Sequence, residues 1–157
     1  MNIDLIVVGK LTEKYFKDGV DEYLKRISRF ADINVIEVKD EKNPTRDGEL
    51  EKIKELEGER IISKIGKGSY VIALCIDGRS FDSVEFSNKV RDLKLIGFSH
   101  VTFIIGGSLG LSDEVIKLAN LKLSFSKFTF PHQLMRLILL EQIYRALTIE
   151  NGLPYHK

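Results

Sequence analysis

The sequence predicts an α/β fold in which a mainly parallel sheet is covered by helices on both faces. Along all 157 residues, the spacing of apolar positions switches between the alternation of strands and the period of helices. Two runs, 70–76 and 101–105, are almost continuously apolar, which is typical of parallel strands buried on both faces. No linker interrupts the pattern, so we expect residues 1–157 to form a single domain.

The first half of the chain predicts two strands and two helices in alternation. Residues 3–8 form a buried strand, and the apolar positions between 16 and 27 recur at helical spacing. A second strand follows at 33–38, and the charged, turn-rich segment 39–47 predicts a surface loop. Apolar residues from 50 to 65 then mark a second helix.

The next part of the chain predicts a strand, a turn and a helix. The strand covers 70–76, and Asp77-Gly78 is a strong local turn signal. Asp82 or Ser83 is suited to cap the helix, because a short side-chain oxygen can accept from the free N–H groups of the first turn. Gly97 is expected to end this helix.

The last third begins with a strand that leads into a glycine-rich turn. Residues 101–105 are followed by Gly-Gly-Ser-Leu-Gly at 106–110, and Ser112 can cap a short helix. The alternation at 121–125 predicts a fifth strand, and Pro131 occupies the place where the last helix should begin.

Composition excludes several classes of protein. There are 24 basic and 23 acidic residues, a net charge of +1, which argues against nucleic-acid binding by bulk charge, so any RNA contact must be local. No apolar run, including 70–76 and 137–140, is long enough to cross a membrane. The N-terminus carries no secretory signal, so we expect a cytoplasmic protein. The single cysteine, Cys75, is expected in the core, and the three histidines lack metal-ligand spacing.

Three strand ends are candidates for a shared binding pocket. They are the loop 77–80, the glycine turn 106–110 and the segment 125–130 before Pro131. The carboxyl ends of parallel strands lie at one edge of a sheet, where such folds bind ligands. The glycine turn matches neither the dinucleotide nor the Walker A pattern, and on its own it fits a tight turn as well as a ligand loop.

The C-terminal tail has an unusual composition. Within six residues it combines Gly152 and Pro154 with Tyr155, His156 and Lys157, a mixture able to stack on a base and hold a phosphate. Since most chain ends fray, a disordered tail is an equally good interpretation. Upstream, we expect Glu141 to pair with Arg136 or Arg145.

Four segments together resemble a known family. They are 103–111, 130–136, 141–146 and 151–157, and they are similar to the bacterial RlmH family of large-subunit ribosomal RNA methyltransferases, in the SPOUT superfamily. The resemblance covers the whole chain. It implies a homodimer with a C-terminal trefoil knot, which no pattern in the sequence reveals. It also implies transfer of a methyl group from S-adenosylmethionine to N3 of a pseudouridine in 23S rRNA of the assembled ribosome.

The resemblance further implies a set of site residues. Beside it stands a hypothesis from the chemistry of the reaction, in which His156 accepts the N3 proton, Tyr155 stacks on or hydrogen-bonds to the base, and Arg136 or Lys157 grips RNA phosphate. If the tail of one subunit closes over the cofactor loop of the other, the site forms only in the dimer. The implied cofactor contacts are Leu74, Gly106, Phe125, Ser126, Lys127, Phe128, Thr129 and Phe130.

Two alternatives from other classes remain open at the level of sequence. One is a ribosome-binding protein without catalytic activity that uses the same loops to contact RNA. The other is a flavodoxin-like nucleotide or flavin protein, which only the α/β pattern favours. Binding of S-adenosylmethionine would separate the first from an enzyme, and a colourless protein would count against flavin.

Overall fold

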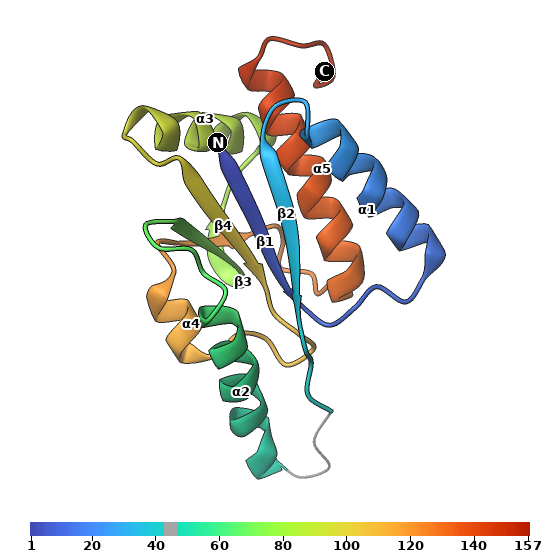
Figure 1. Cartoon of the computed structure of the whole chain (residues 1–157), viewed down its shortest axis with the longest axis vertical. Coiled ribbons are helices and arrows are strands. Elements are labelled where there is room, and N and C mark those ends of the chain that lie inside the picture. Colours follow the sequence, from blue (N-terminus) through green and yellow to red (C-terminus); the bar gives the residue numbers. More distant parts are fainter. Residues whose placement is uncertain (43–46) are drawn as a thin grey trace.

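The computed structural model describes residues 1–42 and 47–157 and contains a five-stranded parallel sheet (Figure 1). The strands are β1 (Asn2–Val8), β2 (Asp32–Val38), β3 (Tyr70–Ser80), β4 (His100–Ile105) and β5 (Leu121–Ser124), and the helices are α1 (Lys14–Ile27), α2 (Leu50–Ile62), α3 (Ser83–Leu95), α4 (Asp113–Leu118) and α5 (His132–Glu150), with a 3-10 turn at Asp47–Glu49. The strand order is β2-β1-β4-β3-β5, and every pairing between these strands is parallel. Of the predicted loop 39–47, residues 39–42 leave the sheet as expected, and 43–46 lie outside the described residues.

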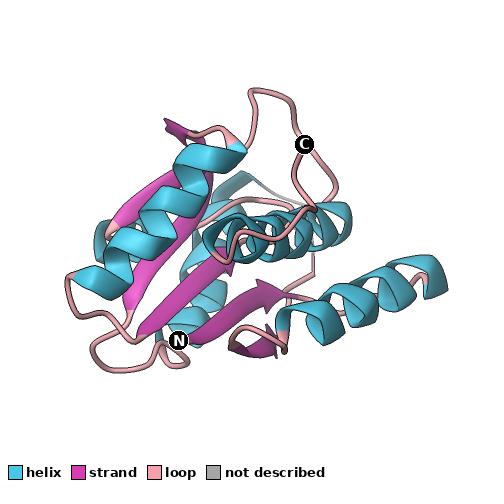
Figure 2. Cartoon of the chain, turned by 90° about the horizontal axis from the view of Figure 1, so that it is seen from above, coloured by secondary structure: helices cyan, strands magenta, loops and turns pink. Residues whose placement is uncertain are grey.

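Helices cover both faces of the sheet, as the sequence predicts (Figure 2). Strand β1 shows why: Leu5 and Val7 pack into one hydrophobic core, and Ile6 and Val8 pack into the other. Because successive side chains of a strand point to opposite faces, a continuous apolar run fills both layers. Helices α1, α3 and α5 pack together on one face, and α2 contacts α4 on the other.

The predicted turn at Asp77-Gly78 is wrong. Strand β3 continues to Ser80, with a register shift in which both Leu74 and Arg79 pair with Leu123 of β5. The strand therefore bulges between these residues and returns to its neighbour. Gly78 permits this path, since a Cβ there would lie 2.7 Å from the carbonyl carbon and oxygen of Lys122.

Most predicted helix ends are confirmed. Asp82 accepts a hydrogen bond from the Glu85 N–H in a full capping box, and Ser112 accepts from the Val115 N–H. Gly97 follows α3 with a φ of +103°, a conformation that suits glycine. Pro131 caps α5 from just outside the helix. None of the described helices is long and apolar enough to cross a membrane. The trefoil knot stays a prediction.

Candidate active site

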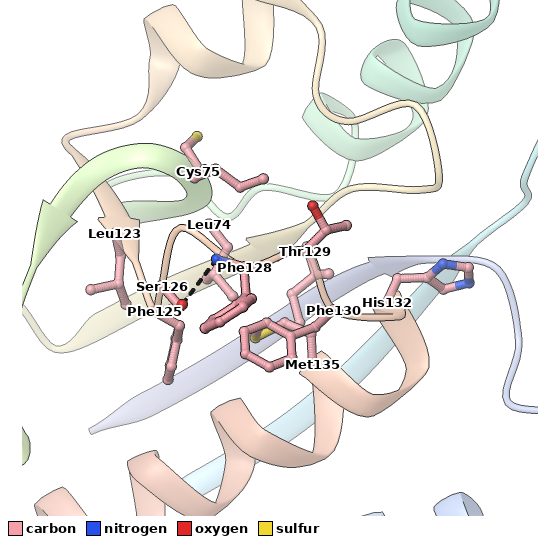
Figure 3. A pocket seen from close by; sticks show the side chains of 12 residues that line it. Leu74, Cys75, Leu123, Phe125, Ser126, Phe128, Thr129, Phe130, His132 and Met135 are labelled. Atoms are coloured by element: carbon pink, nitrogen blue, oxygen red, sulfur yellow. Dashed lines mark hydrogen bonds between the residues drawn. The ribbon is translucent and has the colours of Figure 1, made fainter.

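A cavity of about 130 Å³ lies between the middle of β3, the end of β4, the segment that follows β5 and the start of α5 (Figure 3). Its walls are mostly apolar and aromatic, with a few polar groups, as is typical of small-molecule sites. It is lined by Leu74, Cys75, Ile76, Ile105, Leu123, Phe125, Ser126, Phe128, Thr129, Phe130, His132 and Met135.

Of the three predicted segments, only 125–130 lines this cavity, and it supplies much of the wall. Residues 77–80 and 106–110 do not line it, and Arg79 and Ser80 pair with β5 instead. Next to these two segments, Ile76 in β3 and Ile105 at the end of β4 do contribute to the wall. Of the eight cofactor contacts implied by resemblance, Gly106 and Lys127 are absent from the described lining. The six that line it are Leu74, Phe125, Ser126, Phe128, Thr129 and Phe130.

Hydrogen bonds shape the segment 125–130 as a loop. The Ser126 hydroxyl accepts from the Phe128 N–H at 3.0 Å, which is the dashed line in Figure 3, and the Ser124 hydroxyl donates to the Ile76 carbonyl at 2.9 Å. Phe128 is 79% exposed at the rim of the cavity. A large exposed aromatic ring beside a cavity favours a role in binding, because a ligand or another chain would cover it.

The glycine-rich stretch at 106–110 is a tight turn. The Gly110 N–H donates to the Gly107 carbonyl at 3.0 Å, and Gly110 has a φ of +86°. A Cβ on Gly106 would lie 3.0 Å from the carbonyl carbon of Gly110, so the turn closes too tightly for a side chain. It directly follows Ile105 at the cavity wall.

Six residues of the lining are not among the expected contacts: Cys75, Ile76, Ile105, Leu123, His132 and Met135. His132 and Met135 lie three positions apart at the start of α5, so their side chains share one face of the helix. This spacing in the sequence could have indicated that both side chains lie at the same site. Burial, with Asp77 nearby, raises the pKa of the Cys75 thiol, which therefore stays protonated.

A second cavity, of about 250 Å³, shares His132 with the first. Its lining includes the carboxylates of Asp40, Glu41 and Glu57. Glu57 is buried, accepts a hydrogen bond from the Glu41 N–H at 3.0 Å, and has a pKa raised by its burial. This cavity is therefore suited to a cationic or hydrogen-bond-donating group. Among the described residues, no three His, Cys, Asp or Glu side chains gather to hold a metal ion.

The C-terminal tail folds back on α5. The Leu153 N–H donates to the Thr148 carbonyl at 2.9 Å. The Tyr155 ring packs edge-on against Tyr144 at 4.7 Å between centroids, and its hydroxyl donates to Glu141 Oε1 at 3.0 Å. Burial, together with hydrogen bonds to the Tyr23 hydroxyl and to Glu141, raises the pKa of Tyr155, so it remains a neutral phenol.

Arg145 links this tail to the helix. As predicted, it pairs with Glu141: its Nε and Nη2 donate to Glu141 Oε1 at 3.0 and 2.5 Å. Its Nη1 lies 3.2 Å from Nδ1 of His156, and its guanidinium carbon lies 4.8 Å from the centroid of the Tyr155 ring. The tail residues Tyr155 and His156 are therefore both held by contacts with Arg145.

The expectation that Arg136 grips RNA phosphate is wrong in this fold. Arg136 is 2% exposed, donates to Glu37 Oε2 at 2.8 Å and to the Gly9 carbonyl at 3.3 Å, and thereby ties α5 to β2 and to the residue that follows β1. A phosphate cannot reach it. Lys157, in contrast, is exposed at the end of the tail and stays a predicted phosphate contact.

Within one chain, the tail and the cavity are apart. Met135 lines the cavity, Arg145 holds the tail, and ten residues of α5 separate them, which is about 15 Å of helix axis. Figure 1 shows the chain end beyond the far end of α5. A single chain therefore does not bring His156 next to a ligand in the cavity.

Comparison with known proteins identifies the family. The family described as predicted SPOUT methyltransferases matches residues 1–156. Proteins named ribosomal RNA large subunit methyltransferase H from Streptococcus pneumoniae strains CGSP14 and ATCC 700669 are each 57% identical over 159 aligned positions that cover both chains fully. A solved structure of a probable methylase family protein from Haemophilus influenzae Rd KW20 shares the fold, with a TM-score of 0.50 and a sequence identity of 13%. The match covers 96% of this chain and 66% of the chain in that structure. The chain therefore belongs to the SPOUT methyltransferases and, within them, to the RlmH family.

Proposed function

We propose that this protein transfers a methyl group from S-adenosylmethionine to N3 of a pseudouridine in 23S rRNA, within the assembled ribosome and hence in the cytoplasm. The observation that carries the proposal is the convergence of β3, β4 and the segment 125–130 on one cavity, in a chain so similar to ribosomal RNA methyltransferases over its full length. The flavin alternative has no support from the family to which the chain belongs.

The cavity residues suit S-adenosylmethionine as a ligand. Apolar and aromatic side chains such as Leu74 and Phe130 can pack against an adenine ring, and the irregular backbone of 125–130 has N–H and C=O groups available for its polar edge. The cofactor supplies a methyl group already activated by its sulfonium charge. The main task of the protein is therefore to orient the two reactants and exclude water.

We further propose that the working site is composite and forms in a homodimer. The distance between tail and cavity along α5 supports an arrangement in which the tail of one subunit meets the cavity of the other. In this arrangement Tyr155 and His156 contact the base, and Lys157 contacts the RNA backbone as a point charge.

Replacing Cys75 by Trp should abolish binding of S-adenosylmethionine. The new indole would be far larger than the thiol, at a position that lines a cavity of only about 130 Å³. Isothermal titration calorimetry measures the loss, which should exceed tenfold in Kd, the equivalent of about 1.4 kcal/mol. Cys75→Ser is the matched control and should bind almost as the unchanged protein does. Equal affinities for the two variants would place the cofactor elsewhere.

A methyl-transfer assay tests the proposed function directly. Radiolabelled S-adenosylmethionine is supplied with intact ribosomes, isolated large subunits or bare rRNA, and the modified nucleoside is identified by mass spectrometry. We expect N3-methylpseudouridine in the intact ribosomes, because a protein with a net charge of +1 needs more than bulk charge to bind RNA. Ribosome binding without methyl transfer to any substrate would favour the alternative of a non-catalytic ribosome-binding protein.

A further inference from the structure

We propose that His156 serves the reaction as a hydrogen-bond donor through its Nε2–H, not as the base that removes the N3 proton, and that Arg145 and Glu141 are the positioning residues that impose this role. The inference rests on the proposed function and deepens it. It also revises the role that the sequence analysis expects for His156.

The contact between Arg145 and His156 decides which ring nitrogen carries the proton. Nη1 of Arg145 lies 3.2 Å from Nδ1 of His156. A guanidinium has only donors and stays protonated in proteins, so Nδ1 must accept. Neutral imidazole has one acceptor and one donor nitrogen, so the proton of His156 is on Nε2. The lone pair that a general base needs is already occupied.

Arg145 is itself held in place, which makes the tautomer a property of the fold. Two of its N–H groups donate to Glu141 Oε1, to which the Tyr155 hydroxyl also donates, and its guanidinium lies over the Tyr155 ring. The Tyr155 hydroxyl lies 3.4 Å from that of Tyr23.

Other charged groups lie farther from the imidazole of His156. The Arg26 guanidinium, which pairs with Glu22, lies over the Tyr23 and Tyr144 rings at 5.1 and 5.7 Å. Of these charged and titratable groups, only Arg145 has a described hydrogen bond to the imidazole.

A donor suits the chemistry at N3. In a pseudouridine this nitrogen lies between two carbonyl groups, and loss of its proton spreads negative charge onto both carbonyl oxygens. A positioned N–H that donates to one of these oxygens stabilises the charge as it develops. The proton passes to water, N3 forms a bond to the methyl carbon, and the carbon–sulfur bond breaks with its electron pair left on sulfur as a neutral thioether. His156 is exposed, so RNA can reach its ring.

Substitutions of His156 by Gln and Phe separate donor from base. A glutamine amide can place an N–H near the position of Nε2 but cannot accept a proton near neutral pH. We expect His156→Gln to keep kcat within about tenfold of the unchanged enzyme, with the same pH profile, and His156→Phe to lose about 100-fold or more. Cofactor affinity should be unchanged in both. The proposal is overturned if both variants lose activity equally and the kcat of the unchanged enzyme rises with pH in a way that both variants lack. His156 would then be the base.

A measurement independent of activity reads the tautomer. In long-range ¹H–¹⁵N correlation spectra of the full-length protein at neutral pH, His156 should show a protonated Nε2 and a bare Nδ1. Arg145→Met should shift His156 toward a mixture of tautomers. Arg91→Met is the matched control, because this arginine pairs only with the neighbouring Asp92 among the described residues. A proton on Nδ1 in the unchanged protein refutes the inference, whereas an inactive protein with the expected tautomer refutes the proposed function instead.

Discussion

Replacing Glu37 by Leu should lower the free energy of unfolding by about 3 kcal/mol, whereas replacing Arg136 by Met should cost only about 1 kcal/mol, although each change removes the same ion pair. The reason is the unequal burial of the two partners. The side chain of Arg136 is 2% exposed and that of Glu37 is 38% exposed. Without Glu37, a cation remains in the protein interior, and the Gly9 carbonyl is the one hydrogen-bond partner left to it among the described residues. Without Arg136, the remaining carboxylate is already near water.

Urea denaturation monitored by circular dichroism measures these differences, and the double variant provides the control. Because the harm in Glu37→Leu comes from the stranded guanidinium, adding Arg136→Met should restore stability to nearly that of Arg136→Met alone. The Nε of Arg136 has no hydrogen-bond partner in the described part of the chain, so the site holds the guanidinium imperfectly even when paired. If Arg136→Met proves the more damaging single change, packing rather than charge dominates there.

The same ion pair shows why part of the site could not be predicted. In sequence, Arg136 follows a strand-to-helix junction near other basic residues, which favours a phosphate contact. Its partner Glu37 is 99 positions away and becomes its neighbour only when α5 packs against the end of β2. No local pattern indicates that contact. The continuous apolar run of β1, by contrast, specifies both of its faces within a few residues, which is why the layered fold could be predicted.

The error at Asp77-Gly78 has a related cause. Asp-Gly is a turn signal because it favours a local backbone conformation, but β5 offers a nearby edge on which the extended chain can continue. A glycine there permits close approach to the neighbouring strand as readily as it permits a turn. The meeting of β3, β4 and the segment 125–130 at one cavity was predictable, since parallel order alone brings them to one edge of the sheet, although the loops 77–80 and 106–110 do not line it.

For the C-terminal tail, the sequence left order and disorder equally open. The tail is in fact ordered against α5, and this order depends on Glu141, whose Oε1 accepts hydrogen bonds from both Arg145 and Tyr155. Helical spacing predicts the first of these contacts but carries no information about the second, which requires the chain to reverse after α5. Three contacts of Tyr155, with Glu141, Tyr144 and Arg145, hold the reversed tail against the helix.

The composite site leads to the second large effect: two inactive variants should restore activity when combined in one dimer. A Cys75→Trp subunit has a blocked cavity and an intact tail, whereas a His156→Phe subunit has an intact cavity and a defective tail. If each site joins the cavity of one subunit to the tail of the other, the heterodimer contains one site with both defects and one with none. Its activity should be about half that of the unchanged dimer.

The heterodimer is obtained by co-expressing the two variants with different affinity tags and purifying through both tags in succession. Its methyl transfer to intact ribosomes is compared with that of each variant homodimer, which should be nearly inactive. A heterodimer of unchanged subunits carrying the same tags controls for the purification. If each chain instead combined its own tail with its own cavity, both sites of the heterodimer would carry a defect. Activity no higher than that of the homodimers would therefore contradict the composite site, and the separation of Met135 from Arg145 along α5 would then require a large movement of the tail.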